Sequence, residues 1–311
     1  MRLTCTACVP AVAGTLMLAA AVPATGTAAA AESRVTAKVA DHHLKYGQRL
    51  VVRGGARPGG SVVLQYRAND AGVWTPIATT TAASDGRYRV SVALSRSGAV
   101  RVTTPTPIAA AAAGGAATTS PTTSTRRVRV AARLRTTSAR LNVAAGRRAR
   151  VSGSLRRVRE GRTVTLQART GGRWRTVDRD RTDRRGRFAL STVARRTADL
   201  RVRFAGDALN AGSRVKVGRM RAFRRSFASW YGPGFYGNRT ACGQTFHAGI
   251  MGVAHKTLPC GTRLTFRRGS KLVHARVVDR GPFHAGREFD LSPAVKLALG
   301  FGSTGPVWVA T

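Results

Sequence analysis

The sequence predicts an all-β fold, in which two β-sandwiches precede a small, closed, six-stranded barrel with one short helix. An internal repeat at an offset near 100 relates residues 34–104 to residues 134–204. Both copies alternate apolar and polar residues between glycine-containing turns, with no helical period. The composition agrees with this fold class, because 34 of the 311 residues are Gly and only 6% are aromatic.

Residues 1–31 have the pattern of a signal peptide. Arg2 precedes an apolar stretch over 11–22, and a run of small residues over 27–31 suits signal peptidase. We therefore expect a secreted protein that is extracellular or associated with the cell wall. No later segment holds about 18 uninterrupted apolar residues, so we expect no membrane span.

The four cysteines divide into two pairs. Cys5 and Cys8 lie before the apolar stretch and would leave with the signal peptide. Cys242 and Cys260 remain as an even pair in an oxidising compartment, which predicts one disulfide closing a loop of roughly 20 residues.

Each copy of the repeat predicts one β-sandwich, over 32–104 and 132–218. The copies resemble the Ig-like repeats of secreted actinobacterial proteins. They lack the cysteine pair of antibody domains, so the resemblance goes no further than an Ig-like sandwich. The positions that match between the two copies include Gly47 with Gly146, Trp74 with Trp174 and Gly86 with Gly186.

The segments between the modules read as linkers. Residues 104–125 consist of Thr, Pro, Ala, Gly, Ser and single apolar residues with no charge, so we expect a flexible linker over 105–131. A second, short linker is expected over 219–226, before the C-terminal module of 227–311.

The net charge of +40 is concentrated in the middle of the chain. Residues 126–225 carry 31 basic and 6 acidic side chains. A solvated arginine-rich face is one interpretation, but such a charge repels itself unless an anionic partner screens it. Secretion and the lack of a recognition motif argue against nucleic acid. We therefore expect the middle module to bind anionic wall polymers.

The C-terminal module reads as short strands with one helix. A strand from 226 stops at the Gly-Pro-Gly turn of 232–234, and a hairpin over 264–278 leads into the DRGPF segment. A helix then follows, for which Ser292 suits the N-cap, Pro293 the first helical position and Gly300 the C-terminal cap.

Three segments of this module carry a family resemblance: ASWYGPGFYGNRTACGQTF, AHKTLPCGTRL and VVDRGPFHAGREFDLSPAVKLALG. They resemble the double-psi β-barrel of the rare lipoprotein A (RlpA) family of lytic transglycosylases. The cysteine pair is reminiscent of the related barwin and expansin barrels. The resemblance implies a groove for glycan, no cofactor, and non-hydrolytic cleavage of the MurNAc–GlcNAc bond of peptidoglycan glycan strands that leaves a 1,6-anhydro end.

Protonation of a glycosidic oxygen needs a carboxylic acid, and this module has three. Asp279 matches the acid of the DRGPF motif, and we expect it to be the acid/base group; the alternative is a turn cap paired with Arg280. Asp290 matches the family's IDLS-type motif and is a second catalytic candidate, or alternatively stabilises the helix start. Glu288 is expected to be a solvated charge.

Histidines give one further catalytic candidate. His255 matches the His of an AAH-type segment, so it would orient Asp279 or hydrogen-bond the sugar; the alternative is a structural imidazole. His247, His274 and His284 show no metal-ligand spacing, and we expect no metal site.

Five further residues are expected to contact substrate, and Tyr231 is the aromatic expected to line the groove. The others are Thr240, Gln244, Phe246 and Arg280. Gln244 stands where the family usually carries Glu and cannot exchange a proton. This departure keeps two other functions open: a non-catalytic, expansin-like protein that binds or loosens wall polysaccharide, and a barwin-like secreted inhibitor.

Overall fold

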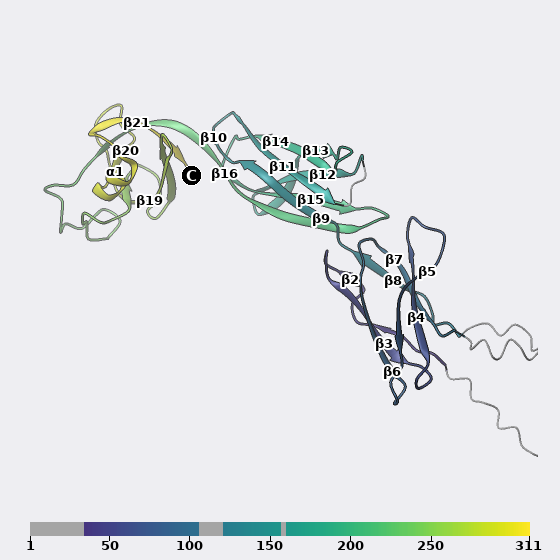
Figure 1. The fold of residues 1–311 in the computed structure, drawn as a ribbon. Coiled ribbons are helices and arrows are strands. Elements are labelled where there is room, and N and C mark those ends of the chain that lie inside the picture. The colour runs from purple at the N-terminus through teal and green to yellow at the C-terminus, as the bar shows by residue number, and fades with distance from the viewer. Residues whose placement is uncertain (1–33, 106–120, 157–159) are drawn as a thin grey trace, which may run out of the picture. The chain divides into compact units, whose positions relative to one another are not determined.

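The computed structural model describes residues 34–105, 121–156 and 160–311 (Figure 1). The all-β fold is confirmed, since these ranges contain 21 strands and one helix. The predicted signal peptide, with Cys5 and Cys8, lies outside the described residues. The single helix in the described ranges is not long and apolar enough to cross a membrane.

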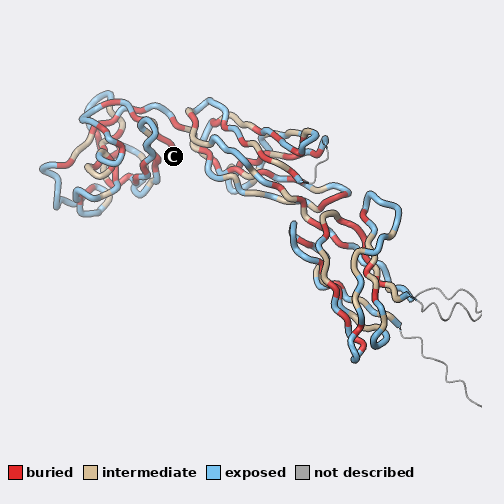
Figure 2. Tube along the Cα trace, viewed as in Figure 1, coloured by how far each residue is buried: buried red, intermediate tan, exposed pale blue. Residues whose placement is uncertain are grey.

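The first repeat forms two sheets, ordered β1-β3-β6 and β2-β8-β7-β4-β5, around a shared core. Buried and exposed residues alternate along the strands (Figure 2). This alternation places valine and leucine between the sheets. The strands are β1 (Lys38–Val39), β2 (His43–Leu44), β3 (Arg49–Gly55), β4 (Ser61–Ala68), β5 (Thr75–Thr81), β6 (Arg87–Ala93), β7 (Gly98–Thr103) and β8 (Arg126–Val130).

The second repeat is built in the same way, from the sheet β14-β11-β9 and the strands β13-β12-β15-β16. Its core is a separate cluster of buried residues. The strands are β9 (Arg133–Arg140), β10 (Asn142–Ala144), β11 (Arg148–Arg156), β12 (Thr163–Thr170), β13 (Arg173–Arg181), β14 (Arg187–Val193), β15 (Ala198–Gly206) and β16 (Ala211–Trp230).

The predicted repeat is confirmed in backbone detail. The β4–β5 pair shifts register between Leu64 and Gln65, and β12–β13 shifts between Leu166 and Gln167. Gly47 and Gly146 both have a positive φ, 84° and 81°, because the turn before the long strand needs a left-handed residue.

Both predicted linkers need correction. Residues 126–130, placed in the first linker, form β8 and pair with β7 and β2. Residues 219–226, taken as the second linker, lie inside the continuous strand β16. Arg221–Phe223 pair with β10, and the residues from Arg224 pair with β21. Their backbone groups are satisfied by strands distant in sequence, which a local pattern does not reveal. Residues 106–120 lie outside the described residues.

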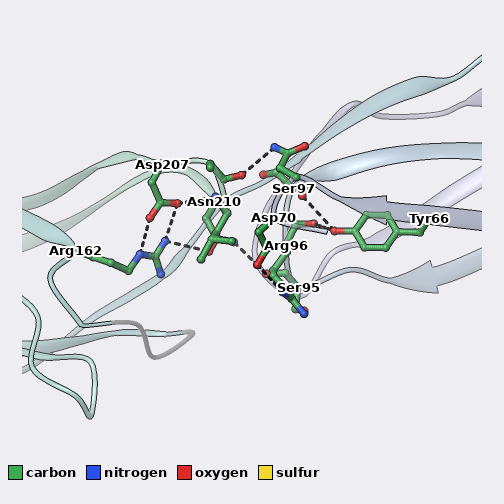
Figure 3. Close-up of polar contacts among 11 residues, drawn as sticks. Tyr66, Asp70, Ser95, Arg96, Ser97, Arg162, Asp207 and Asn210 are labelled. Carbon is green, nitrogen blue, oxygen red and sulfur yellow. Dashed lines mark hydrogen bonds and ion pairs between the residues drawn. The ribbon is translucent and has the colours of Figure 1, made fainter. Parts of the chain in front are cut away.

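The loop after β15 is hydrogen-bonded to the first repeat (Figure 3). The Asn210 side-chain amide donates to the backbone oxygens of Ser95 (3.0 Å) and Val130 (3.3 Å). The buried guanidinium of Arg162 donates to the Asp207 carboxylate (2.8 Å) and to Asn210 Oδ1 (3.1 Å). Arg162 and Asp207 therefore fix the conformation of the loop that makes these contacts.

The C-terminal module is a six-stranded closed sheet in the order β16-β20-β17-β19-β18-β21, and β21 pairs back with β16. Helix α1 has the predicted caps: Ser292 Oγ accepts from the Val295 amide, and Gly300 has a φ of 59°. The elements added here are β17 (Gly252–Ala254), β18 (Arg263–Arg268), β19 (Lys271–Asp279), β20 (Phe289–Leu291), α1 (Pro293–Leu299) and β21 (Thr304–Ala310).

The predicted disulfide is confirmed between Cys242 and Cys260, whose Cα atoms are 5.7 Å apart. It joins two loops of the barrel module that no strand pair connects. Replacing both cysteines by Ser should lower the free energy of unfolding of the barrel by about 3 kcal/mol, because the unfolded chain regains the entropy of an open loop. Hydrogen exchange of the barrel strands in denaturant measures this loss. Unchanged protection of β17 and β19 in the double variant would contradict it.

Candidate active site

The site is a row of side chains across four adjacent strands of the barrel. Ser229 on β16 pairs with Asp290 on β20, Asp290 pairs with Ala254 on β17, and Ala254 pairs with Asp279 on β19. Directly paired residues of neighbouring strands present their side chains on the same face. The two carboxylates therefore flank the short side chain of Ala254, with Cα atoms two strand spacings, about 10 Å, apart.

Asp290 is held by Ser229, whose Oγ donates a hydrogen bond to Asp290 Oδ1. Gly281 passes close to its other oxygen: a Cβ at that position would lie 3.9 Å from Asp290 Oδ2. Gly281 also has a φ of 124°, which favours glycine. The glycine of the DRGPF segment thus lets this loop approach the second carboxylate.

Asp279 holds the disulfide loop against the barrel. Its Oδ1 accepts hydrogen bonds from the backbone amides of Ala241 and Arg280, both 2.9 Å long. The alternative interpretation, a turn cap paired with Arg280, holds only for the Arg280 backbone amide, because the Arg280 side chain does not contact this carboxylate. That guanidinium donates instead to the backbone oxygens of Leu258 (2.9 Å) and His255 (3.2 Å) and contacts Cys260 Sγ. The carboxylate is therefore bound by amides and not by a cation.

Tyr231 lies beside both carboxylates. Burial raises the pKa of its hydroxyl, and the negative charges of Asp279 and Asp290 raise it further. The buried hydroxyl makes no hydrogen bond of normal geometry with the described residues, although it is near enough to Asp279 to be affected by that carboxylate. A phenol in this position is a proton donor for a carboxylate or for a bound hydroxyl group.

An aromatic stack continues from Tyr231 toward solvent. Its ring lies on Phe246 with centroids 4.5 Å apart, and Phe246 lies on Tyr236 at 5.8 Å. Phe246 is only 2% exposed, so it supports the stack and its face is not open to a sugar. Phe235 and Tyr236 are 52% and 46% exposed, and the sequence analysis missed them. Their position directly after a Gly-Pro-Gly turn was the available signal.

Glu288 is not the solvated charge that was expected. Arg224 binds both of its oxygens, Ser226 Oγ donates to Oε2 at 2.7 Å, and His255 Nε2 lies 3.4 Å from Oε1. The Arg224 guanidinium is the main cause that lowers the pKa of Glu288 to about 2. Glu288 therefore forms a structural ion pair beneath the site.

His255 takes part in this same cluster. Its Nδ1 accepts from the backbone amides of Thr257 (3.1 Å) and Leu258 (2.9 Å), so Nε2 carries the proton and faces Glu288. Its backbone amide donates to the backbone oxygen of Asp279 at 3.1 Å. His255 thus positions the Asp279 strand through the main chain, while its ring is occupied by structural contacts.

Thr240 and Gln244 close a turn next to the disulfide. The Thr240 backbone amide donates to the Gln244 backbone oxygen at 2.8 Å, and the Gln244 backbone amide donates to Thr240 Oγ at 3.2 Å. Gln244 also lines a pocket of about 620 Å³ together with Met251 and Arg276. Neither Asp279 nor Asp290 lines that pocket, and we place the site at the carboxylates because the chemistry needs an acid.

The comparisons with known proteins agree with this geometry. Residues 225–310 match the protein family described as lytic transglycolase. The C-terminal module is a double-psi β-barrel.

The relatives that are similar to this chain are RlpA proteins. A probable endolytic peptidoglycan transglycosylase RlpA of Synechocystis sp. is 46% identical over 88 residues, which are 28% of this chain and 27% of that protein. The endolytic peptidoglycan transglycosylase RlpA of Pseudomonas aeruginosa strain UCBPP-PA14 is 47% identical over 27% of this chain and 26% of its own length. That of Neisseria meningitidis serogroup A is 43% identical over 26% and 35%. The matched region thus spans about a quarter to a third of these relatives.

The Glu288 cluster predicts a pH dependence of stability. Its lowered pKa means that the charged form stabilises the fold, fully above the ordinary value of 4.5, and that this contribution is lost as the pH falls from 4.5 toward about 2. Glu288→Gln should remove this term, so the wild-type protein should lose about 1–2 kcal/mol more than the variant over that interval, after allowance for solvent screening. Urea denaturation at pH 6 and pH 2.5 measures it. Parallel curves for the two proteins would contradict it.

Proposed function

We propose that this protein is a secreted, wall-associated lytic transglycosylase that acts on peptidoglycan. Its barrel cleaves the MurNAc–GlcNAc bond of glycan strands and leaves 1,6-anhydro ends. The observation that carries the proposal is the pair of carboxylates, Asp279 and Asp290, on either side of Ala254 and beside the Tyr231 hydroxyl. The similarity to RlpA transglycosylases supports the same substrate class.

Asp279 serves as the acid and then the base. The protonated carboxyl group gives its proton to the glycosidic oxygen as the bond from C1 breaks. The resulting carboxylate takes the proton of the C6 hydroxyl, whose oxygen bonds to C1, so the carboxyl group is regenerated and no water is consumed. Asp290 stabilises the positive charge that develops at C1. The Tyr231 hydroxyl donates a hydrogen bond to a carboxylate or to a sugar hydroxyl group. The exposed Phe235 and Tyr236 offer ring faces for the flanking sugars.

Asp279→Asn should lower the formation of anhydro-ended products at least 100-fold, because an amide cannot exchange the proton. Asp290→Asn should lower it by tenfold or more. Mass spectrometry of soluble fragments, after incubation with intact and peptide-stripped sacculi, measures both. Asp85→Asn, in an exposed turn of the first repeat, is the matched control and should leave the yield unchanged.

A second candidate function rests on Gln244. If this position needs a proton-exchanging group, the barrel holds glycan without cutting it, as an expansin-like module would. The wild-type protein would then release no anhydro product from either substrate while it still binds sacculi tightly. Product formation by the wild type sinks this alternative; its absence from wild type, with binding intact, sinks the transglycosylase.

The middle repeat supplies the second part of the proposed function, a tether to anionic wall polymers. Its support is the excess of 31 basic over 6 acidic residues across 126–225. Retention on purified walls should fall steeply between 50 mM and 500 mM salt, because screening shortens the reach of these charges. Pelleting assays measure the bound fraction, and salt-independent retention would rule out the tether.

A further inference from the structure

One face of the second repeat carries cations at directly opposed positions. On the strands β13-β12-β15-β16, Arg203 pairs with Arg214 and Arg201 pairs with Lys216. Arg179 and Arg181, on β13, extend the same face across β12. Five of these six side chains are exposed, and Arg201 is partly exposed. The six form a lattice with steps of about 7 Å along the strands, about 5 Å between β15 and β16, and about 10 Å between β13 and β15, because β12 lies between them.

This arrangement is unfavourable for the isolated fold. Like charges directly opposite each other in a sheet are destabilising. The pKa of Arg201 is lowered, first by its burial and then by the charges of Arg214 and Arg203. No carboxylate within the described ranges forms an ion pair with any of the six.

Two acids of the same sheet make contacts elsewhere. Asp178 and Asp180, on β13, accept hydrogen bonds from the backbone amides of Ser191 (2.6 Å) and Ala189 (2.7 Å). Both donor amides belong to β14, in the opposite sheet. These acids therefore bridge the two sheets of the sandwich and do not neutralise the outer face.

Comparison with the first repeat shows which arginines of this face belong to the fold shared by both repeats. Arg101 lies over Trp74 at 4.4 Å and bonds Gln65 at 2.7 Å. In the second repeat, Arg201 lies over Trp174 at 4.2 Å and bonds Gln167 at 2.8 Å. This arginine is therefore part of the common scaffold.

Three of the other cations, Arg179, Arg181 and Arg203, are additions to that scaffold. In the first repeat, Val63 pairs with Thr79 on one side and Thr103 on the other. In the second repeat, Thr165 pairs with Arg179 and Arg203 at the equivalent positions. Thr81 likewise corresponds to Arg181, as the partners of Ser61 and Thr163. The same fold therefore forms with threonine at these sites. Folding does not require the arginines, which suggests that they bind a ligand.

We propose that this face is the surface of the middle repeat that binds a linear phosphodiester polymer of the wall, of the polyol-phosphate type. The inference rests on the proposed tether and assigns it a location and a ligand. Five of the six cations are Arg, whose planar guanidinium binds phosphate oxygens in pairs. An extended lattice of such groups suits a chain with regularly repeated phosphates. The exposed carboxylate of this face, Asp199 on β15, lies directly opposite Arg219 of β16, and the six cations outnumber it.

The test uses the full-length mature protein and immobilised poly(glycerol phosphate). The variant replaces Arg179, Arg181 and Arg203 by Thr, the residue of the first repeat at each equivalent position. The matched control replaces three exposed arginines of the opposite sheet, Arg135, Arg140 and Arg150, by Thr, so both proteins lose the same charge. We expect the face variant to bind at least tenfold more weakly and the control to change less than threefold.

The outcomes separate the inference from the proposed tether. Equal weakening in both variants would overturn the assigned face while leaving a diffuse electrostatic tether. Salt-independent retention of wild type on walls would overturn the tether itself. Tighter binding of the face to polyglutamate, or to duplex DNA of equal charge, would replace the phosphodiester wall polymer by a carboxylate polymer or a nucleic acid. Thermal unfolding at the wild-type temperature confirms that each variant is folded.

Discussion

The short strand β17 organises the site, because it is hydrogen-bonded to β19 on one side and to β20 on the other. Its residue Ala254 takes one carboxylate as a partner from each neighbour. Every other feature of the site is fitted to this row: the amides that bind Asp279, the hydroxyl of Ser229 on Asp290, and the Tyr231 phenol affected by both charges. The β17–β19 pairing is irregular between Val253 and Ala254, and this irregularity places Asp279 opposite Ala254.

Several acidic residues of this cationic chain bind particular groups of the fold. In the barrel, Glu288 neutralises Arg224 and orders His255, so only Asp279 and Asp290 remain for chemistry. In the second repeat, Asp178 and Asp180 bridge the two sheets, and Asp207 binds the buried Arg162. These acids therefore do not neutralise the six cations of the outer face within the described residues. In the proposed function the two modules have complementary roles, one holding anionic polymer and the other cutting glycan.

Much of the fold followed from local chemistry. Turn glycines, the caps of α1 and the offset between the repeats predicted the elements, because each depends on residues close in sequence. The errors lay at 126–130 and 219–226, where arginine-rich segments that were expected to be linkers form strands. Those segments are strands because distant partners satisfy their amides, and composition does not record such partners. Glu288 was misjudged for the same reason, since Arg224 lies 64 residues away.

The sequence by itself determined the all-β class, the repeat, the disulfide pair, the location of the charge and the identity of the candidate acids. The fold class and the charge follow from periodicity, turn chemistry and composition, the repeat and the cysteine pair from comparing positions along the chain, and the candidate acids from the resemblance to the RlpA motifs. Only the tertiary structure decided that Asp279 and Asp290 flank one alanine, that His255 faces Glu288, and that six cations share one face. Strand order and register arise from long-range pairing and core packing, and these act between residues that no local pattern connects.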